Sequence, residues 1–143
     1  MKIALASDHA GFNLKALLVD TLTTAGHEVA DLGPTDTDSV DYPDYGTKLA
    51  DHIAAGEAER GIAICGSGIG ISIAVNRNPA CRCARVSEPL SAALARQHND
   101  ANVIALGERL IGADMAKAIV EAFLTTEFEG GRHQRRVDKL GNC

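Results

Sequence analysis

Gly61-Ile62-Ala63-Ile64-Cys65 is followed directly by Gly66-Ser67-Gly68-Ile69-Gly70, so a short apolar run ends in a cysteine and then in a glycine-rich loop. A short apolar run of this kind is typical of a buried parallel strand. The alternate glycines let the backbone turn sharply and expose its N–H groups at the start of a helix, where they can bind an oxyanion or a phosphate. We therefore expect the active centre at this loop.

The same alternation of strands and helices extends in both directions from the loop. Gly or Pro residues mark the expected boundaries, and apolar residues recur at helical spacing between them. Strands are expected at Lys2 to Ala6, Glu28 to Asp31, Gly61 to Cys65, about Arg82 to Val86 and Asn102 to Leu106. Helices are expected from Leu14 to a C-cap at Gly26, at about 44–55, at about 70–76, from an N-cap at Ser87 through Pro89 to near Gln97, and at about 113–124, with a short last helix after Gly131.

This order of elements predicts an α/β fold. Five short apolar strands alternating with helices form a parallel sheet covered on both faces, joined by right-handed crossovers. We expect a three-layer Rossmann-like or flavodoxin-like domain with a five-stranded parallel sheet and a C-terminal helical tail. A chain of 143 residues with 45% hydrophobic residues predicts one domain over residues 1–143.

The composition excludes several classes of partner. A net charge of −5 and 3% aromatic residues argue against nucleic-acid binding, which leaves a small molecule as the expected ligand. The apolar run at the N-terminus is too short for a signal peptide or a membrane span, so we expect a cytoplasmic protein. The four cysteines are expected as free thiols, and Cys81-x-Cys83 as two small, partly buried residues entering a strand rather than as a metal site.

Topology concentrates the chemistry at the carboxyl ends of the first and third strands. Ligands of open α/β sheets bind where the strand order reverses, which for an order of 2-1-3-4-5 lies between these two strands. Ser7-Asp8-His9 and Cys65-Gly66-Ser67-Gly68 follow them. The loop is no dinucleotide fingerprint, because Ile71 stands where that motif has its third glycine. A thiolate of Cys65 would be stabilised at a helix start, although a small buried residue is the alternative.

Two further polar groups have both a functional and a structural interpretation. His98 in Gln97-His98-Asn99-Asp100 can move a proton near neutral pH or can simply end a helix. Arg132 and Arg136, four residues apart, could bind a phosphate together with Arg109, or could form a solvated helix face. Tyr42 is either core or pocket wall. The other histidines, His27, His52 and His133, are expected on the surface.

Five motifs together are specific: Ser-Asp-His-Ala-Gly-Phe at 7–12, Asp-Tyr-Pro at 41–43, Cys-Gly-Ser-Gly-Ile-Gly-Ile-Ser-Ile-Ala at 65–74, Arg-Gln-His-Asn-Asp-Ala-Asn at 96–102 and Glu-Gly-Gly-Arg-His at 129–133. In this order they resemble the type B ribose-5-phosphate isomerases, of the family that includes galactose-6-phosphate isomerase subunits. The resemblance implies an aldose–ketose isomerase of the pentose phosphate pathway that interconverts ribose 5-phosphate and ribulose 5-phosphate through a cis-enediolate. It implies no cofactor and no metal, and a homodimer that could pair into tetramers.

The resemblance also implies the site. Cys65 would be the base, the amides of Gly66, Gly68, Ile69 and Gly70 would stabilise the enediolate, and Ser67 would move a proton between O1 and O2. His98, oriented with Asp8, would open the sugar ring. The implied phosphate ligands are His9, Arg132, Arg136 and Arg109, and the implied sugar contacts are Asn99 and Tyr42. His98 and Asn99 would come from the partner subunit.

Two alternatives remain open. The first is the same reaction on a six-carbon sugar phosphate, allose 6-phosphate or galactose 6-phosphate. The second is a non-catalytic module that binds phosphosugars. One branch of the family has a glutamate as base near Ile71, and since isoleucine accepts no proton, the resemblance favours the cysteine-dependent branch.

Overall fold

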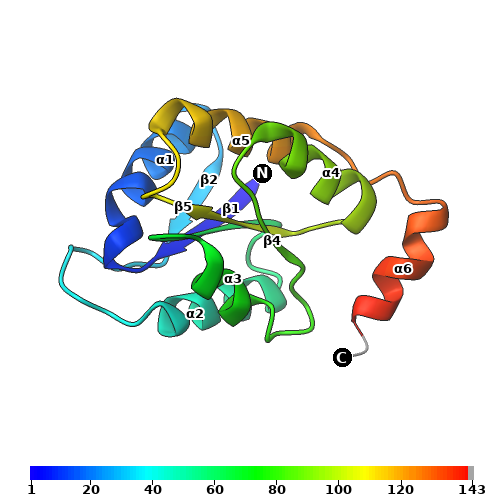
Figure 1. Cartoon of the computed structure of the whole chain (residues 1–143), viewed down its shortest axis with the longest axis horizontal. Helices are drawn as coiled ribbons and strands as arrows, with labels where there is room; N and C mark the ends of the chain where they lie inside the picture. The colour runs from blue at the N-terminus through cyan, green and yellow to red at the C-terminus, as the bar shows by residue number, and fades with distance from the viewer. Residues whose placement is uncertain (142–143) are drawn as a thin grey trace.

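The computed structural model describes residues 1–141 and has a five-stranded parallel sheet between two layers of helices (Figure 1). The strands are β1 (Lys2–Ser7), β2 (Glu28–Asp31), β3 (Arg60–Cys65), β4 (Cys83–Arg85) and β5 (Val103–Gly107). The helices are α1 (Phe12–Thr24), α2 (Tyr42–Ala54), α3 (Ile69–Val75), α4 (Pro89–Asn99), α5 (Ala113–Thr125) and α6 (Arg132–Leu140), with a short 3-10 helix at His9–Gly11. The expected three-layer α/β fold with a helical tail is confirmed.

The strand order is β2-β1-β3-β5-β4, which corrects the expected order 2-1-3-4-5 at one edge. β5 is buried at every residue, so it pairs with a strand on each side. β4 has only three residues, none of them fully buried, and such a short strand fits an edge. β1 and β3 are still neighbours, with Ser7 opposite Ile64, so their carboxyl ends meet as expected.

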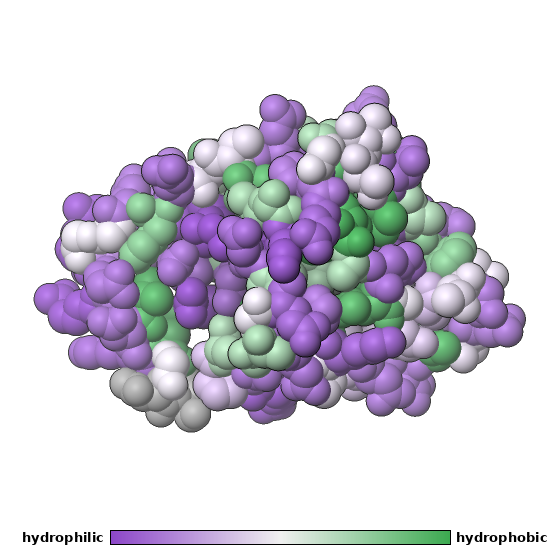
Figure 2. Space-filling view, turned by 180° about the vertical axis from the view of Figure 1, so that it is seen from behind, coloured by the Kyte–Doolittle hydropathy of each residue, from purple (hydrophilic) through white to green (hydrophobic). Residues whose placement is uncertain are grey.

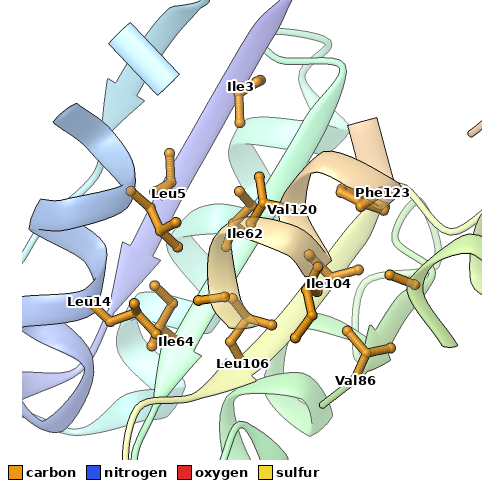
Figure 3. Close-up of a cluster of buried hydrophobic side chains, with 14 of the residues drawn as sticks. Ile3, Leu5, Leu14, Ile62, Ile64, Val86, Ile104, Leu106, Val120 and Phe123 are labelled. Carbon is orange, nitrogen blue, oxygen red and sulfur yellow. The ribbon is translucent and has the colours of Figure 1, made fainter. Parts of the chain in front are cut away.

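Side-chain size alternates along the central strands and determines how the helices cover the sheet. The larger aliphatic side chains of β1, β3 and β5 point toward α1, α4 and α5 and form one buried cluster with side chains of these helices, including Phe123 (Figure 3). Each such side chain, when fully buried, contributes about 1.5–3 kcal/mol to stability. The alternate positions carry mostly alanine and point toward α2 and α3. Cys65 belongs to this second face and lies beneath the start of α3.

The last helix, α6, stands beside α4 and apart from the other elements (Figure 1). Its buried side chains are His133 and Val137, one helical turn apart. Seen from behind, the molecule is hollowed between α6 and its body (Figure 2), where a groove of about 380 Å³ runs from Leu140 to the β4 edge. None of the helices within residues 1–141 is long and apolar enough to cross a membrane.

The start of α4 differs by one residue from the expectation, because Glu88 and not Ser87 is the N-cap. Pro89 occupies the first helical position, which its fixed φ favours, so the cap is the residue directly before it. The Glu88 carboxylate accepts hydrogen bonds from the hydroxyl and from the backbone N–H of Ser91. The hydroxyl bond, followed by the backbone bond, lowers the pKa of Glu88 below its ordinary value of 4.5.

This cap predicts a pH-dependent contribution to stability. A carboxyl group whose pKa is lowered by folding stabilises the fold above its ordinary pKa, and the contribution is lost as the pH falls through the folded value, here below 4.5. Glu88→Ala should therefore lower Tm near neutral pH, and the two melting curves should converge in acid. Glu88→Gln, whose amide oxygen still accepts, should lose less. Thermal unfolding followed by circular dichroism measures this, and a Tm difference that is the same in acid would contradict it.

Candidate active site

The carboxyl ends of β1 and β3 open into a cleft of about 440 Å³. The loop after β3 forms its floor, and side chains that follow β1 and β5 and begin α2 form its walls. The lining residues are Asp8, His9, Ala10, Tyr42, Cys65, Gly66, Ser67, Gly70, Arg109 and Leu110. All of these except Ala10 and Leu110 were expected at the site from the sequence. The cleft thus brings a thiol, an imidazole, a carboxylate and a guanidinium together.

The thiol of Cys65 lies at the bottom of this cleft and is 5% exposed. Its Sγ accepts a hydrogen bond from the backbone N–H of Gly68 at 3.1 Å. Gly68 has a φ of +77° and is the N-cap of α3. A Cβ at Gly68 would lie 2.8 Å from the Leu106 carbonyl carbon, so the loop can only pass here with glycine. An N–H that points at sulfur favours the anionic form of a thiol.

The rest of the glycine loop is held by local contacts. The Ser67 hydroxyl accepts a hydrogen bond from the N–H of Ile69 at 3.2 Å. The Tyr42 ring packs against Gly70, where a Cβ would come within 2.6 Å of the ring. Tyr42 is 42% exposed, so it is a wall of the cleft and not part of the core. The Ile69 side chain points to solvent, whereas Ile71 is fully buried.

The charged groups of the cleft come from three different segments. The Asp8 carboxylate accepts a hydrogen bond from the Gly11 N–H at 3.1 Å and caps the short turn before α1. The Nδ1 atom of His9 lies 3.1 Å from the backbone nitrogen of Val40, which joins it to the loop before α2. The Arg109 guanidinium lies over Gly66, within 3.1 Å of where a Cβ on that residue would be. A small anion in the cleft would face His9, Arg109 and the amides of the loop.

Four expected site residues lie away from this cleft. His98 and Asn99 are in the last turn of α4. The α4 helix runs from the carboxyl end of β4 back to the amino end of β5. Its last turn therefore lies at the amino ends of the strands, whereas Cys65 lies at their carboxyl ends. Asn99 lines the groove beside α6, and Arg132 and Arg136 are exposed on α6 itself. Within one chain, the expected site is therefore divided into two halves.

The prediction that His133 is a surface residue is wrong. His133 is 7% exposed, and its ring stacks on that of His98 with the centroids 4.6 Å apart and the planes 17° apart. Its Nε2 atom lies 3.5 Å from the Glu129 carboxylate. The sequence does not reveal that α6 folds back onto α4. The spacing of His133 and Val137 by one turn is the signal that could have shown a buried stripe.

One group of side chains within residues 1–141 could approach a metal ion. His98, Glu129 and His133 each offer a ligand atom, and these atoms lie within 4.8 Å of one another. The two imidazole planes are nearly parallel, so their in-plane lone pairs do not converge on one point. The arrangement suits ring stacking better than coordination.

Of the other described cysteines, Cys81 is buried and Cys83 is partly buried. Cys65, Cys81 and Cys83 are free thiols as expected, and Cys143 lies outside the described residues. Burial raises the pKa of Cys81 to about 11, and burial together with the nearby Cys81 raises the pKa of Cys83 as well. Since the thiolate is the metal ligand and the nucleophile, neither group favours such chemistry at neutral pH.

Two residues near the glycine-rich loop after β3 are not among the site residues expected from the sequence. Arg85 ends β4 and donates a hydrogen bond from Nε to the Ser67 carbonyl at 3.0 Å. Glu108 follows β5, and its carboxylate accepts a hydrogen bond from the backbone N–H of Leu14 at the start of α1. Both residues stand at or just past the carboxyl end of a strand. The rule that led to Asp8 and Cys65 could have found them too.

Known proteins share this fold and sequence along nearly the whole chain. The profile of the ribose/galactose isomerase family matches residues 3–140. Ribose-5-phosphate isomerase B of Escherichia coli is 49% identical over 139 residues, which are 97% of this chain and 93% of that protein. The structure of ribose-5-phosphate isomerase B from Clostridium thermocellum aligns with a TM-score of 0.98 at 51% identity, covering 99% of this chain and 96% of that one.

A further solved structure contains a sugar phosphate. Ribose-5-phosphate isomerase B from Mycoplasma genitalium, with bound ribulose 5-phosphate, aligns with a TM-score of 0.94 at 41% identity and covers 99% of this chain and 94% of that one. The fold and the cleft define an α/β protein with a cysteine and a glycine-rich loop at the carboxyl ends of the central strands. More particularly, the chain belongs to the ribose/galactose isomerase family.

Proposed function

We propose that this chain is a ribose-5-phosphate isomerase that interconverts ribose 5-phosphate and ribulose 5-phosphate. The observation that carries the proposal is the Cys65 thiol, which accepts the Gly68 N–H at 3.1 Å in a cleft that also holds His9 and Arg109. Relatives that are named for this reaction match over nearly the whole chain, and one of them binds ribulose 5-phosphate. Residues 1–143 would act as one isomerase domain.

The chemistry requires a base, an oxyanion site and a proton shuttle. Cys65 would take the proton from C2 and return it to C1 on the same face of the enediolate. The amides of Gly66, Gly68, Ile69 and Gly70 are the candidate donors to the cis-enediolate, and preorganised donors of this kind contribute about 3–4 kcal/mol each in other enzymes. Ser67, with its hydroxyl near these amides, would move the second proton between O1 and O2. The reaction so written balances without a redox cofactor.

The complete site would need a second copy of the chain. Within one chain, none of the four remaining expected residues lines the cleft that holds Cys65. His98 and Asn99 lie in the last turn of α4, and Arg132 and Arg136 lie on α6. The groove between α6 and the body offers a second copy a place to dock, next to Asn99. In a two-fold symmetric dimer, each cleft would receive these four residues from the partner subunit. His98 near Asp8 would then open the sugar ring, and the two arginines with His9 and Arg109 would hold the phosphate. Such dimers could also pair into tetramers.

The proposal is tested by incubating the purified protein with ribose 5-phosphate and measuring ketose formation. Allose 6-phosphate and galactose 6-phosphate are assayed in parallel at the same concentrations. We expect turnover of ribose 5-phosphate with the highest kcat/KM of the three. A six-carbon substrate with a higher kcat/KM would assign the reaction to that sugar instead. Binding of all three sugar phosphates without turnover would contradict the proposal that the chain is an isomerase and would favour a phosphosugar-binding module.

A further inference from the structure

A single peptide unit connects Arg85 to the Cys65 thiol. The carbonyl of Ser67 accepts a hydrogen bond from Arg85 Nε at 3.0 Å. The N–H of the same peptide, which belongs to Gly68, donates to Cys65 Sγ at 3.1 Å. Arg85 reaches this peptide from the end of β4, two strands away from the strand that carries Cys65. The two hydrogen bonds therefore lie at opposite ends of one amide group.

Packing leaves this peptide little freedom apart from rotation. A Cβ at Gly68 would lie 2.8 Å from the carbonyl carbon of Leu106, and a Cβ at Gly107 would lie 2.7 Å from the Ser67 carbonyl oxygen. The peptide thus rests directly on the backbone at the end of β5, without side chains between them. A rotation that turned the Gly68 N–H away from the sulfur would also turn the Ser67 carbonyl away from Arg85. Holding one end of the amide therefore holds the other.

We propose that Arg85 is a positioning residue that aligns and polarises the Ser67–Gly68 peptide and so stabilises the thiolate of Cys65. The inference rests on the proposed role of Cys65 as the base. A cationic donor on a carbonyl draws electron density toward the oxygen, and this makes the N–H of the same amide a stronger donor. The guanidinium charge adds a direct attraction for the thiolate, which solvent weakens because Arg85 is exposed.

The inference is tested by the pH dependence of Cys65 alkylation. Wild-type protein and Arg85→Gln are treated with iodoacetamide across a pH series, and carboxamidomethylation of Cys65 is quantified by peptide mass spectrometry. Since exposed charge interactions are modest, we expect Arg85→Gln to slow alkylation about two- to fivefold near neutral pH. The two rates should converge in base, where the thiol is ionised in both proteins. Arg85→Lys, which keeps the charge but lacks the Nε–H, should lie between them.

The matched control is Lys117→Gln, which removes another exposed cation, from α5. It should follow the wild-type profile. The other ionisable groups around the thiol, Asp8, His9, Tyr42 and Arg109, are unchanged in both variants. An Arg85→Gln profile that coincides with that of wild type and Lys117→Gln overturns the inference. A profile that is slower by the same factor at every pH also overturns it, since that indicates altered access to the thiol.

This experiment separates the inference from the proposed function. Alkylation is read on the protein itself and needs no turnover. If the profile shifts but wild type does not isomerise ribose 5-phosphate, the role of Arg85 stands as a property of the thiol and the proposed function fails. If wild type isomerises and the profile does not shift, the proposed function stands and Arg85 has no positioning role.

Discussion

Cys65→Ala is expected to lower kcat for the isomerisation of ribose 5-phosphate by about 10³-fold, because general acid–base catalysis contributes on the order of 10² to 10⁴ in rate. The variant removes the group that would take the proton from C2. It keeps the amides of the loop, which would still bind the substrate oxygens. We therefore expect KM to change far less than kcat. Initial rates of ketose formation over a range of substrate concentrations measure both constants.

The fold should survive this change. The side chain of Cys65 lies on the alanine-lined face of the sheet, among Ala4, Ala6 and Ala63, so alanine at this position continues an existing pattern. Circular dichroism and thermal unfolding should show a folded variant with a Tm close to that of wild type.

Cys81→Ala is the matched control for the loss of a thiol. Cys81 is equally buried, and burial raises its pKa to about 11, but it does not line the cleft. This variant should retain the turnover of wild type, and iodoacetamide should still inactivate it through Cys65. Near wild-type turnover of Cys65→Ala, with activity lost in Cys81→Ala, would show that the base has been assigned to the wrong residue.

The fold was predictable because its local signals agree with its packing. β2 has the bounds expected for it, because a turn at Gly26 precedes it and an acidic residue stands on each side of its two apolar residues. Strand order was less predictable. Which of β4 and β5 lies at the edge depends on how completely each is buried between neighbours. The two expected runs have equal length, and the one signal that separates them is the pair of arginines, Arg82 and Arg85, in the first run.

The cleft could be predicted from the sequence because a rule for parallel sheets places its residues. The second half of the expected site could not, because no such rule applies to it. Asp8 and Cys65 each follow a strand of a parallel sheet, and the carboxyl ends of neighbouring strands must meet. No comparable rule places His98, which lies within a helix, or His133, whose burial depends on where α6 docks. Arg85 shows a third case. Its contact with Ser67 crosses β5, and it depends on the strand order that the sequence left open.

The two halves of the site lead to a prediction on mixed dimers. Cys65→Ala and His98→Gln should each be nearly inactive alone, because each variant loses one proton-transfer group from every site. In a dimer that contains one chain of each kind, one cleft would combine the intact Cys65 of the second variant with the intact His98 of the first. The other cleft would lack both. Mixed dimers should therefore recover activity that neither variant has.

The recovery has an expected size. If the two variants are unfolded together and refolded, random pairing gives about half mixed dimers, each with one intact site of two, so about one quarter of the wild-type activity should return. The control pairs Cys65→Ala with Cys65→Ser, which can restore no site. Mixed dimers isolated through two different affinity tags should have about half of the wild-type activity. Tagged mixed dimers without activity would show that each chain builds its site alone, and that His98 acts, if at all, within the fold of its own subunit.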